Sequence, residues 1–159
     1  MTIHFGYEKK QVIQALRYHF ISRPENRIMI ILVNVFAIFS LVLYLMHKIT
    51  PLAFMTGTTL WIVLMISYWF IMPLMVYKRT ETFLHEFNMR FEENRFTLEH
   101  EMGHREWNWK ELSTFLESPH FFHLYFNSRS FFLVPKVGFK DRDEVFEFRQ
   151  MLKEKVKKG

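Results

Sequence analysis

Two histidines with a glutamate between them carry the most recognisable chemical pattern in this chain. The segment His100-Glu101-Met102-Gly103-His104 matches H-E-x-x-H. On a helix, histidines four residues apart share a face and can bind zinc, while the glutamate serves as a general base. One hypothesis is therefore a membrane-anchored zinc metalloprotease with His100 and His104 as ligands and Glu101 as base. The sequence selects no third ligand among the later carboxylates that are available: Glu117, Glu144 and Glu147.

The residues around this motif favour strands instead of a helix. Apolar and polar residues alternate in Arg95–Glu101 and again in Glu106–Lys110, which is the period of a half-buried strand. Met102-Gly103 stands where a hairpin turn would join the two strands. We therefore expect His100 and His104 to flank a turn. The other histidines of this half are predicted to lie on polar faces or at strand ends: His85, His120 and His123.

Two apolar runs precede this region, Ile28–Met46 and Leu52–Tyr77. No Asp or Glu occurs between Asn26 and Thr80. A helix of about 20 residues spans the ~30 Å hydrocarbon layer of a bilayer. The first run is longer than the apolar part of a signal peptide and lacks a cleavage site after it. The sequence therefore predicts a transmembrane helical hairpin, residues 28–77, that stays in the mature protein.

The basic residues predict the orientation of this hairpin. Of the 21 Lys and Arg residues, only Lys48 lies between the two runs. The positive-inside rule then places both termini in the cytoplasm. The residues close to the two runs agree with this orientation: Arg17, Arg23, Arg27, Lys78 and Arg79.

Three features inside the hairpin suggest local contacts. Pro73 removes a backbone donor, so we expect it to kink the second helix and to free the carbonyl of Trp69. Asn34 is predicted to form a hydrogen bond between the two helices. Ala53 and Gly57 form a pair of small residues that permits close approach of another helix.

The second half predicts an α+β domain of small size. Aromatic and β-branched runs with turn residues between them indicate five or six short antiparallel strands from about Asn88, and Thr2–Tyr7 is a candidate for one more. A helix is expected over 141–157, capped by Asp141 with Glu144 three positions on. Its apolar stripe comprises Val145, Phe148, Leu152 and Val156. A curved antiparallel sheet plugged by a C-terminal helix is the architecture of a pleckstrin-homology-like barrel.

The predicted division of the chain is an N-terminal cytoplasmic segment, the hairpin and a cytoplasmic domain: 1–27, 28–77 and 78–159. Several residues of the last part are candidates for contact with a partner or with lipid. Trp107 and Trp109 alternate on one strand and can stack on a ligand or pack in a core. The basic candidates are Lys136, Lys155, Lys157 and Lys158.

Two segments also carry a family resemblance: Trp107-Asn108-Trp109-Lys110-Glu111-Leu112 and Phe132-Leu133-Val134-Pro135-Lys136-Val137-Gly138-Phe139. The chain resembles the YcxB-like family of small bacterial membrane proteins, which have two transmembrane helices and a C-terminal domain of this form. The resemblance implies that architecture and no particular reaction. Physically, Pro135 should end the last strand, Phe139 should anchor the following loop, and Lys136 should face outward.

The amino-acid composition excludes several classes of function. Cysteine is absent, which excludes a disulfide framework and thiolate chemistry. The net charge of +5 is spread over interspersed basic and acidic residues, without the basic face that nucleic-acid binding needs. We expect a non-enzymatic protein of the bacterial inner membrane, without a cofactor. Its small cytoplasmic module would bind a protein partner, another copy of itself or lipid headgroups.

Overall fold

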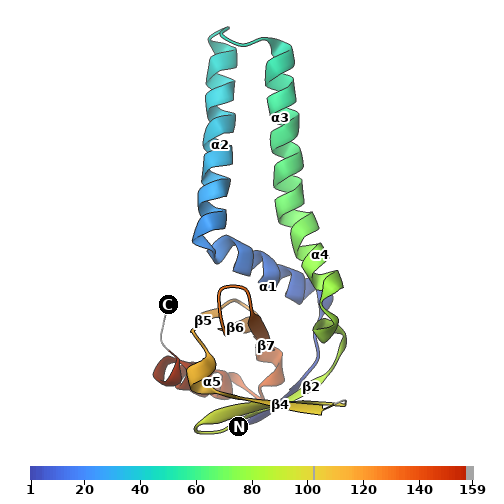
Figure 1. Ribbon diagram of the computed structural model, residues 1–159, viewed down its shortest axis with the longest axis vertical. Helices are drawn as coiled ribbons and strands as arrows, with labels where there is room; N and C mark the ends of the chain where they lie inside the picture. Colours follow the sequence, from blue (N-terminus) through green and yellow to red (C-terminus); the bar gives the residue numbers. More distant parts are fainter. Residues whose placement is uncertain (102, 157–159) are drawn as a thin grey trace. The chain divides into compact units, whose positions relative to one another are not determined.

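The computed structural model describes residues 1–101 and 103–156 and divides the chain into two compact units (Figure 1). The β unit joins residues 1–15 to the residues from 81 onward, and the hairpin unit is Leu16–Thr80. The elements follow one another as β1 (Thr2–Phe5), α1 (Lys9–Ser22), α2 (Pro24–Leu45), α3 (Pro51–Ile66), the π-helix η1 (Ser67–Ile71), α4 (Met72–Arg79), the 3-10 helix η2 (Glu81–Leu84), β2 (Phe87–Phe91), β3 (Arg95–His100), β4 (Gly103–Asn108), the 3-10 helix η3 (Trp109–Glu111), β5 (Thr114–Glu117), β6 (Phe121–Tyr125), β7 (Phe131–Pro135), the 3-10 helix η4 (Lys136–Gly138) and α5 (Arg142–Lys155).

The β unit contains two antiparallel sheets. The first has the strand order β1-β2-β3-β4 and the second the order β5-β6-β7. Strand β2 shows why the sequence alternates: Phe87, Met89 and Phe91 are buried, whereas Asn88 and Arg90 are exposed. Successive side chains of a strand point to opposite faces, so one face of this sheet builds the core. Six strands follow from Phe87 onward, which agrees with the five or six antiparallel strands predicted from about Asn88.

Strand β1 joins the N-terminal residues to the sheet that follows the hairpin unit. It pairs antiparallel with β2, with Thr2 opposite Arg90 and Phe5 opposite Phe87. The expected N-terminal strand is therefore confirmed. The hairpin unit is inserted between two neighbouring strands of one sheet, so the chain leaves the β unit after β1 and returns to it before β2. The division differs from the sequence-based boundary at residue 27, because residues 1–15 belong with the strands that follow the hairpin.

Aromatic side chains and helix α5 fill the core of the β unit. The ring of Phe148 on α5 lies 4.4 Å from that of Phe91, and 5.1 Å from those of Phe122 and Phe139. Phe148 and Leu152 are completely buried, as the predicted apolar stripe requires. The helix begins as expected, because the Asp141 carboxylate accepts hydrogen bonds from the backbone N–H groups of Asp143 and Glu144.

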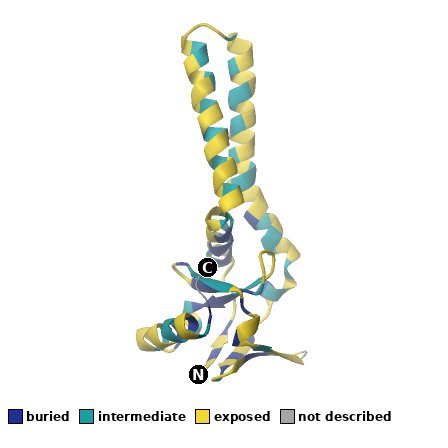
Figure 2. Cartoon of the chain, turned by 60° about the vertical axis from the view of Figure 1, so that its left-hand side comes forward, coloured by how far each residue is buried: buried dark blue, intermediate teal, exposed yellow. Residues whose placement is uncertain are grey.

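The hairpin unit contains two helical stretches that are long and apolar enough to cross a membrane, Pro24–Leu45 and Pro51–Arg79. In the most apolar part of the first stretch no residue is buried, and in that of the second stretch 6% is buried (Figure 2). The core helices of a soluble protein are mostly buried. The two helices meet where the rings of Tyr44 and Phe54 stack at 4.5 Å. Gly57 lies against α2, since a Cβ atom at this position would stand 3.8 Å from the Ser40 hydroxyl.

Asn34 differs from its prediction. Its amide donates a 2.8 Å hydrogen bond to the carbonyl of Ile30, one turn back in the same helix, instead of bridging to α3. A backbone carbonyl one turn away is always within reach of a short polar side chain on a helix. The hydrogen bond across the hairpin was therefore a wrong prediction.

Candidate functional site

The H-E-x-x-H segment forms the end of a β-hairpin. His100 is the last residue of β3, and Gly103 begins β4 with a φ of 153°, which a residue with a side chain rarely adopts. Met102 lies outside the described residues. His104 is opposite Glu99, so the two share one face of the sheet, and His100 points to the other face. The two histidines cannot act as the paired ligands of a helical zinc motif.

The surroundings of these residues agree with a strand role. The ring of His100 lies edge-on to Phe87 at 5.6 Å and 6.3 Å from the ring of His85. Over residues 1–101 and 103–156, no group of three or more His, Cys, Asp or Glu side chains is arranged to hold a metal ion. Glu117, one suggested third ligand, is instead bound to two basic side chains.

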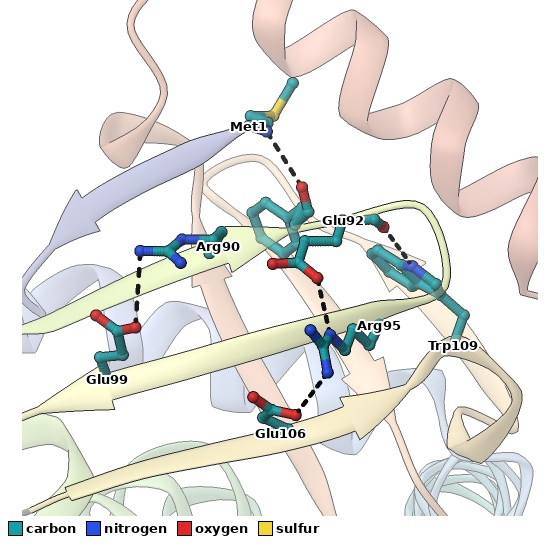
Figure 3. Close-up of polar contacts among 8 residues, drawn as sticks. Met1, Arg90, Glu92, Arg95, Glu99, Glu106 and Trp109 are labelled. Carbon is teal, nitrogen blue, oxygen red and sulfur yellow. Dashed lines mark hydrogen bonds and ion pairs between the residues drawn. The ribbon is translucent and has the colours of Figure 1, made fainter.

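Trp107 and Trp109 have different environments. Trp109 is buried, and its indole N–H donates a 3.0 Å hydrogen bond to the carbonyl of Glu92 (Figure 3). Trp107, on β4, is only half-buried between Phe96 and Phe126, with ring centroids 5.5 Å away from each. The guanidinium of Arg105 lies 5.4 Å above the Trp107 ring. Of the two candidates, Trp107 is the one that a partner can reach.

Strand β4 is one of the two edge strands of the first sheet, and β1 is the other. Among residues 1–101 and 103–156, β3 is the single strand that pairs with β4, and residues 103–106 and 108 of β4 are exposed. An edge strand leaves backbone N–H and C=O groups that can pair with another chain. This edge, together with Trp107 and Arg105, is called the β4 edge below.

The outer face of the same sheet carries a ladder of exposed ion pairs (Figure 3). Arg95 contacts Glu92 at 2.8 Å and Glu106 at 3.2 Å, and Arg90 lies 3.8 Å from Glu99. The hydrogen bond from Arg95 lowers the pKa of the Glu92 carboxyl. Exposed pairs of this kind contribute little stability. These pairs place positive and negative side chains next to one another on the outer face of the sheet.

Lys136 departs from its expected outward orientation. Its ammonium group donates a 2.7 Å hydrogen bond to Glu117 on β5 and lies 5.2 Å from the centroid of the Phe122 ring. Arg149 on α5 donates two hydrogen bonds of 2.8 Å to the same carboxylate. The Glu117 carboxylate thus joins β5, the segment after β7 and helix α5. The expectations for the neighbouring residues are confirmed, because Pro135 ends β7 and Phe139 is buried.

This cluster predicts a dependence of stability on pH. The hydrogen bond from Arg149, together with Lys136, lowers the pKa of Glu117 from 4.5 to about 2. A carboxyl with a depressed pKa in the folded state stabilises the protein above its unfolded pKa, and this contribution is lost as the pH falls toward about 2. Glu117→Gln should lower the free energy of unfolding by about 1.5–3 kcal/mol at pH 7.

Urea denaturation of the full chain in detergent, followed by tryptophan fluorescence, measures this difference. We expect the gap between wild type and Glu117→Gln to shrink as the pH is lowered from 5 to about 2, the folded pKa of Glu117. Glu154→Gln, at an exposed site of α5, is the matched control. A gap that stays constant over this pH range would show that the charge of Glu117 plays no part.

The remaining basic and histidine candidates are located as follows. The ammonium group of Lys155 donates a hydrogen bond to the carbonyl of Glu93. Lys157 and Lys158 lie outside the described residues. His123 is fully buried, with Nε2 3.0 Å from the Ser118 hydroxyl, so its predicted place on a polar face is wrong. A period-two pattern cannot reveal this, because both faces of β6 are covered.

The hairpin unit contains a polar contact that was only half predicted. Pro73 has no N–H, so the carbonyl of Trp69 loses its helical donor, and the helix takes a π turn over Ser67–Ile71. The Nε of Arg17 on α1 donates a 3.0 Å hydrogen bond to this carbonyl. The freed carbonyl was expected, whereas its partner, 52 residues away, was not.

A family model described as YcxB-like protein matches residues 91–152. This part of the chain is similar to YcxB-like proteins. The match runs from the last residue of β2 into α5 and includes the β4 edge and the Glu117 cluster. It confirms the resemblance carried by the tryptophan segment and by Val134-Pro135-Lys136. No curated protein and no solved structure matches the chain.

The YcxB-like domain match leaves out strand β1 and the hairpin unit. Strand β1 nevertheless belongs to the same sheet as β3 and β4, which lie within the matched region. Of the features described above, sequence reasoning missed the Arg149 and Arg17 contacts. Neither contact has a local signal in the sequence, because the Arg149 contact joins residues 32 positions apart and the Arg17 contact joins residues 52 positions apart.

Proposed function

We propose that this protein is a non-enzymatic binding module held at the bacterial inner membrane. The hairpin unit spans the bilayer with both chain termini in the cytoplasm, and the β unit is a pleckstrin-homology-like module on that side. Two antiparallel sheets of four and three strands followed by a C-terminal helix support this assignment of the fold. The long, unburied apolar helices support the membrane anchor.

The β4 edge is the proposed binding surface. An extended segment of a partner protein would add to this strand through main-chain hydrogen bonds, which is a common mode of peptide recognition. The observation that carries the proposal is the open, exposed edge beside the half-buried Trp107. Aromatic and Arg side chains are enriched where binding energy concentrates.

The membrane topology can be tested directly because the chain has no cysteine. We expect Ser128→Cys, in the loop between β6 and β7, to be protected from a membrane-impermeant maleimide in intact cells and labelled after lysis. Lys48→Cys, in the connection between α2 and α3, should be labelled in intact cells. The opposite pattern would invert the predicted topology. A denatured sample, in which both cysteines must be labelled, controls for the reactivity of each site.

Site-specific photo-crosslinking in cells tests the binding surface. A photoreactive residue at Arg105 should form a defined crosslinked product, whereas one at the exposed Arg142 of α5 should not. Trp107→Ala should reduce the Arg105 product several-fold without changing protein abundance. A product that contains two copies of this chain would identify self-association. Equal crosslinking from both positions, or only lipid adducts, would contradict peptide binding at the β4 edge.

A further inference from the structure

An apolar hollow lies at the end of the hairpin unit where α1 meets the long helices. Its volume is about 410 Å³, and its lining includes Ile21 of α1, Ile30 of α2, and Trp69 and Phe70 of η1. No polar surface contributes to this lining. A hollow of this character suits a hydrocarbon chain and offers nothing to a polar metabolite.

Arg17 lies on two of the rings that line the hollow. Its guanidinium carbon is 5.4 Å from the centroid of Trp69 and 5.2 Å from that of Phe70. The Nε group is used for the bond to the Trp69 carbonyl. Within the part of the chain that the structure describes, this is the one side-chain hydrogen bond that Arg17 makes. The guanidinium is therefore held in place through Nε and the two rings. The N–H groups of its two Nη atoms are left to donate hydrogen bonds to a ligand.

The charge of this end of the hairpin unit fits an anionic ligand. The basic residues that flank the long helices here are Arg17, Arg23, Arg27, Lys78 and Arg79. Glu25 is the single carboxylate side chain in Leu16–Thr80. Basic pockets between helices on the cytoplasmic side of a membrane attract phosphate-bearing lipid headgroups. A guanidinium fork also matches a phosphate better than an ammonium group does.

We propose that the hollow holds an acyl chain of an anionic glycerophospholipid whose phosphate binds the Nη groups of Arg17. The helix break at Pro73 explains why the site forms, because the freed Trp69 carbonyl fixes the guanidinium beside the apolar hollow. This inference rests on the membrane-spanning part of the proposed function and is independent of the β4 edge.

Fluorescence quenching by brominated lipids tests the site in the full chain. The variant Trp61→Phe leaves Trp69 as the single tryptophan of the hairpin unit. Reconstituted into bilayers, it should be quenched more by brominated phosphatidylglycerol than by brominated phosphatidylcholine at equal mole fraction. Arg17→Gln in this background should reduce the relative binding constant for the anionic lipid about fivefold, and Arg17→Lys should restore it only in part.

Lys78→Gln is the matched control, since it removes one positive charge from the same end without touching the rings. Equal losses in Arg17→Gln and Lys78→Gln would mean general surface attraction and would overturn the site. Displacement by excess inorganic phosphate would assign the contact to a free anion and would also overturn it. Equal quenching by both lipids rejects the lipid site alone. Absence of quenching by either lipid rejects the membrane-spanning hairpin as well.

Discussion

Replacing Phe148 with alanine should destabilise the β unit by about 3–5 kcal/mol, which is the usual cost of removing a buried aromatic ring. Phe148 is completely buried and its ring contacts those of Phe91, Phe122 and Phe139. These three rings come from β2, β6 and the segment before α5, so a cavity here affects both sheets at once. Folded domains of this size have total stabilities of about 5–15 kcal/mol, so the loss is a large share.

Phe146→Ala provides a matched control on the same helix. Phe146 is 53% exposed, and its truncation should change stability by less than about 0.5 kcal/mol. Urea denaturation of both variants as full chains in detergent, followed by tryptophan fluorescence, gives the comparison. Equal effects of the two substitutions would mean that α5 does not pack on the sheets through Phe148.

Phe5→Ala should be nearly as destabilising, at about 3–5 kcal/mol, although Phe5 precedes the hairpin and its partners follow it. The side chain is 3% exposed, and its ring lies 6.1 Å from that of Phe87 and 6.4 Å from that of Phe132. Gly138 approaches it closely, since a Cβ atom there would be 3.1 Å from the Phe5 Cβ. Phe5 therefore fills space between β1, β2 and the segment after β7.

Amide hydrogen exchange distinguishes this effect from a merely local one. In Phe5→Ala the amides of β2 should lose protection, because β1 is the edge that covers this strand. Thr2→Ala, at an exposed position of the same strand, is the control and should leave β2 protected. Unchanged exchange in Phe5→Ala would show that β1 is dispensable and that the β unit begins after the hairpin.

Local patterns predicted much of this molecule. The period-two runs predicted five or six strands where the structure has β2 to β7, and the helical stripe with Asp141 predicted α5. The predicted strand over Glu106–Lys110 was too long, because β4 ends at Asn108 and Trp109 begins the 3-10 helix η3. The uncharged runs predicted two long helices that stay unburied. Pro73 alone was enough to predict the freed carbonyl of Trp69. These features depend on residues within one or two turns of each other, so a single sequence contains them in full.

The candidate contacts that involve distant residues were not predictable in this way. Lys136 was expected to face outward because its partner, Glu117, lies on another strand. His123 was misplaced because every residue of β6 is buried in the folded unit, so neither face of this strand is polar. His100 and His104 match a zinc motif in sequence, and it is the register of β3 and β4 that sends them to opposite faces.

The sequence by itself determined the two apolar helices, the basic residues that flank them, the order of the strands along the chain and the capped C-terminal helix. Only the tertiary structure decided that β1 pairs with β2, although the whole hairpin unit lies between them in the sequence. It also decided that Glu117 forms ion pairs with Lys136 and Arg149, and that Arg17 donates a hydrogen bond to the carbonyl of Trp69. The physical reason is the same in each case. Hydrophobic period, charge and capping act between near neighbours, whereas pairing and packing between distant segments follow from the shape of the whole core.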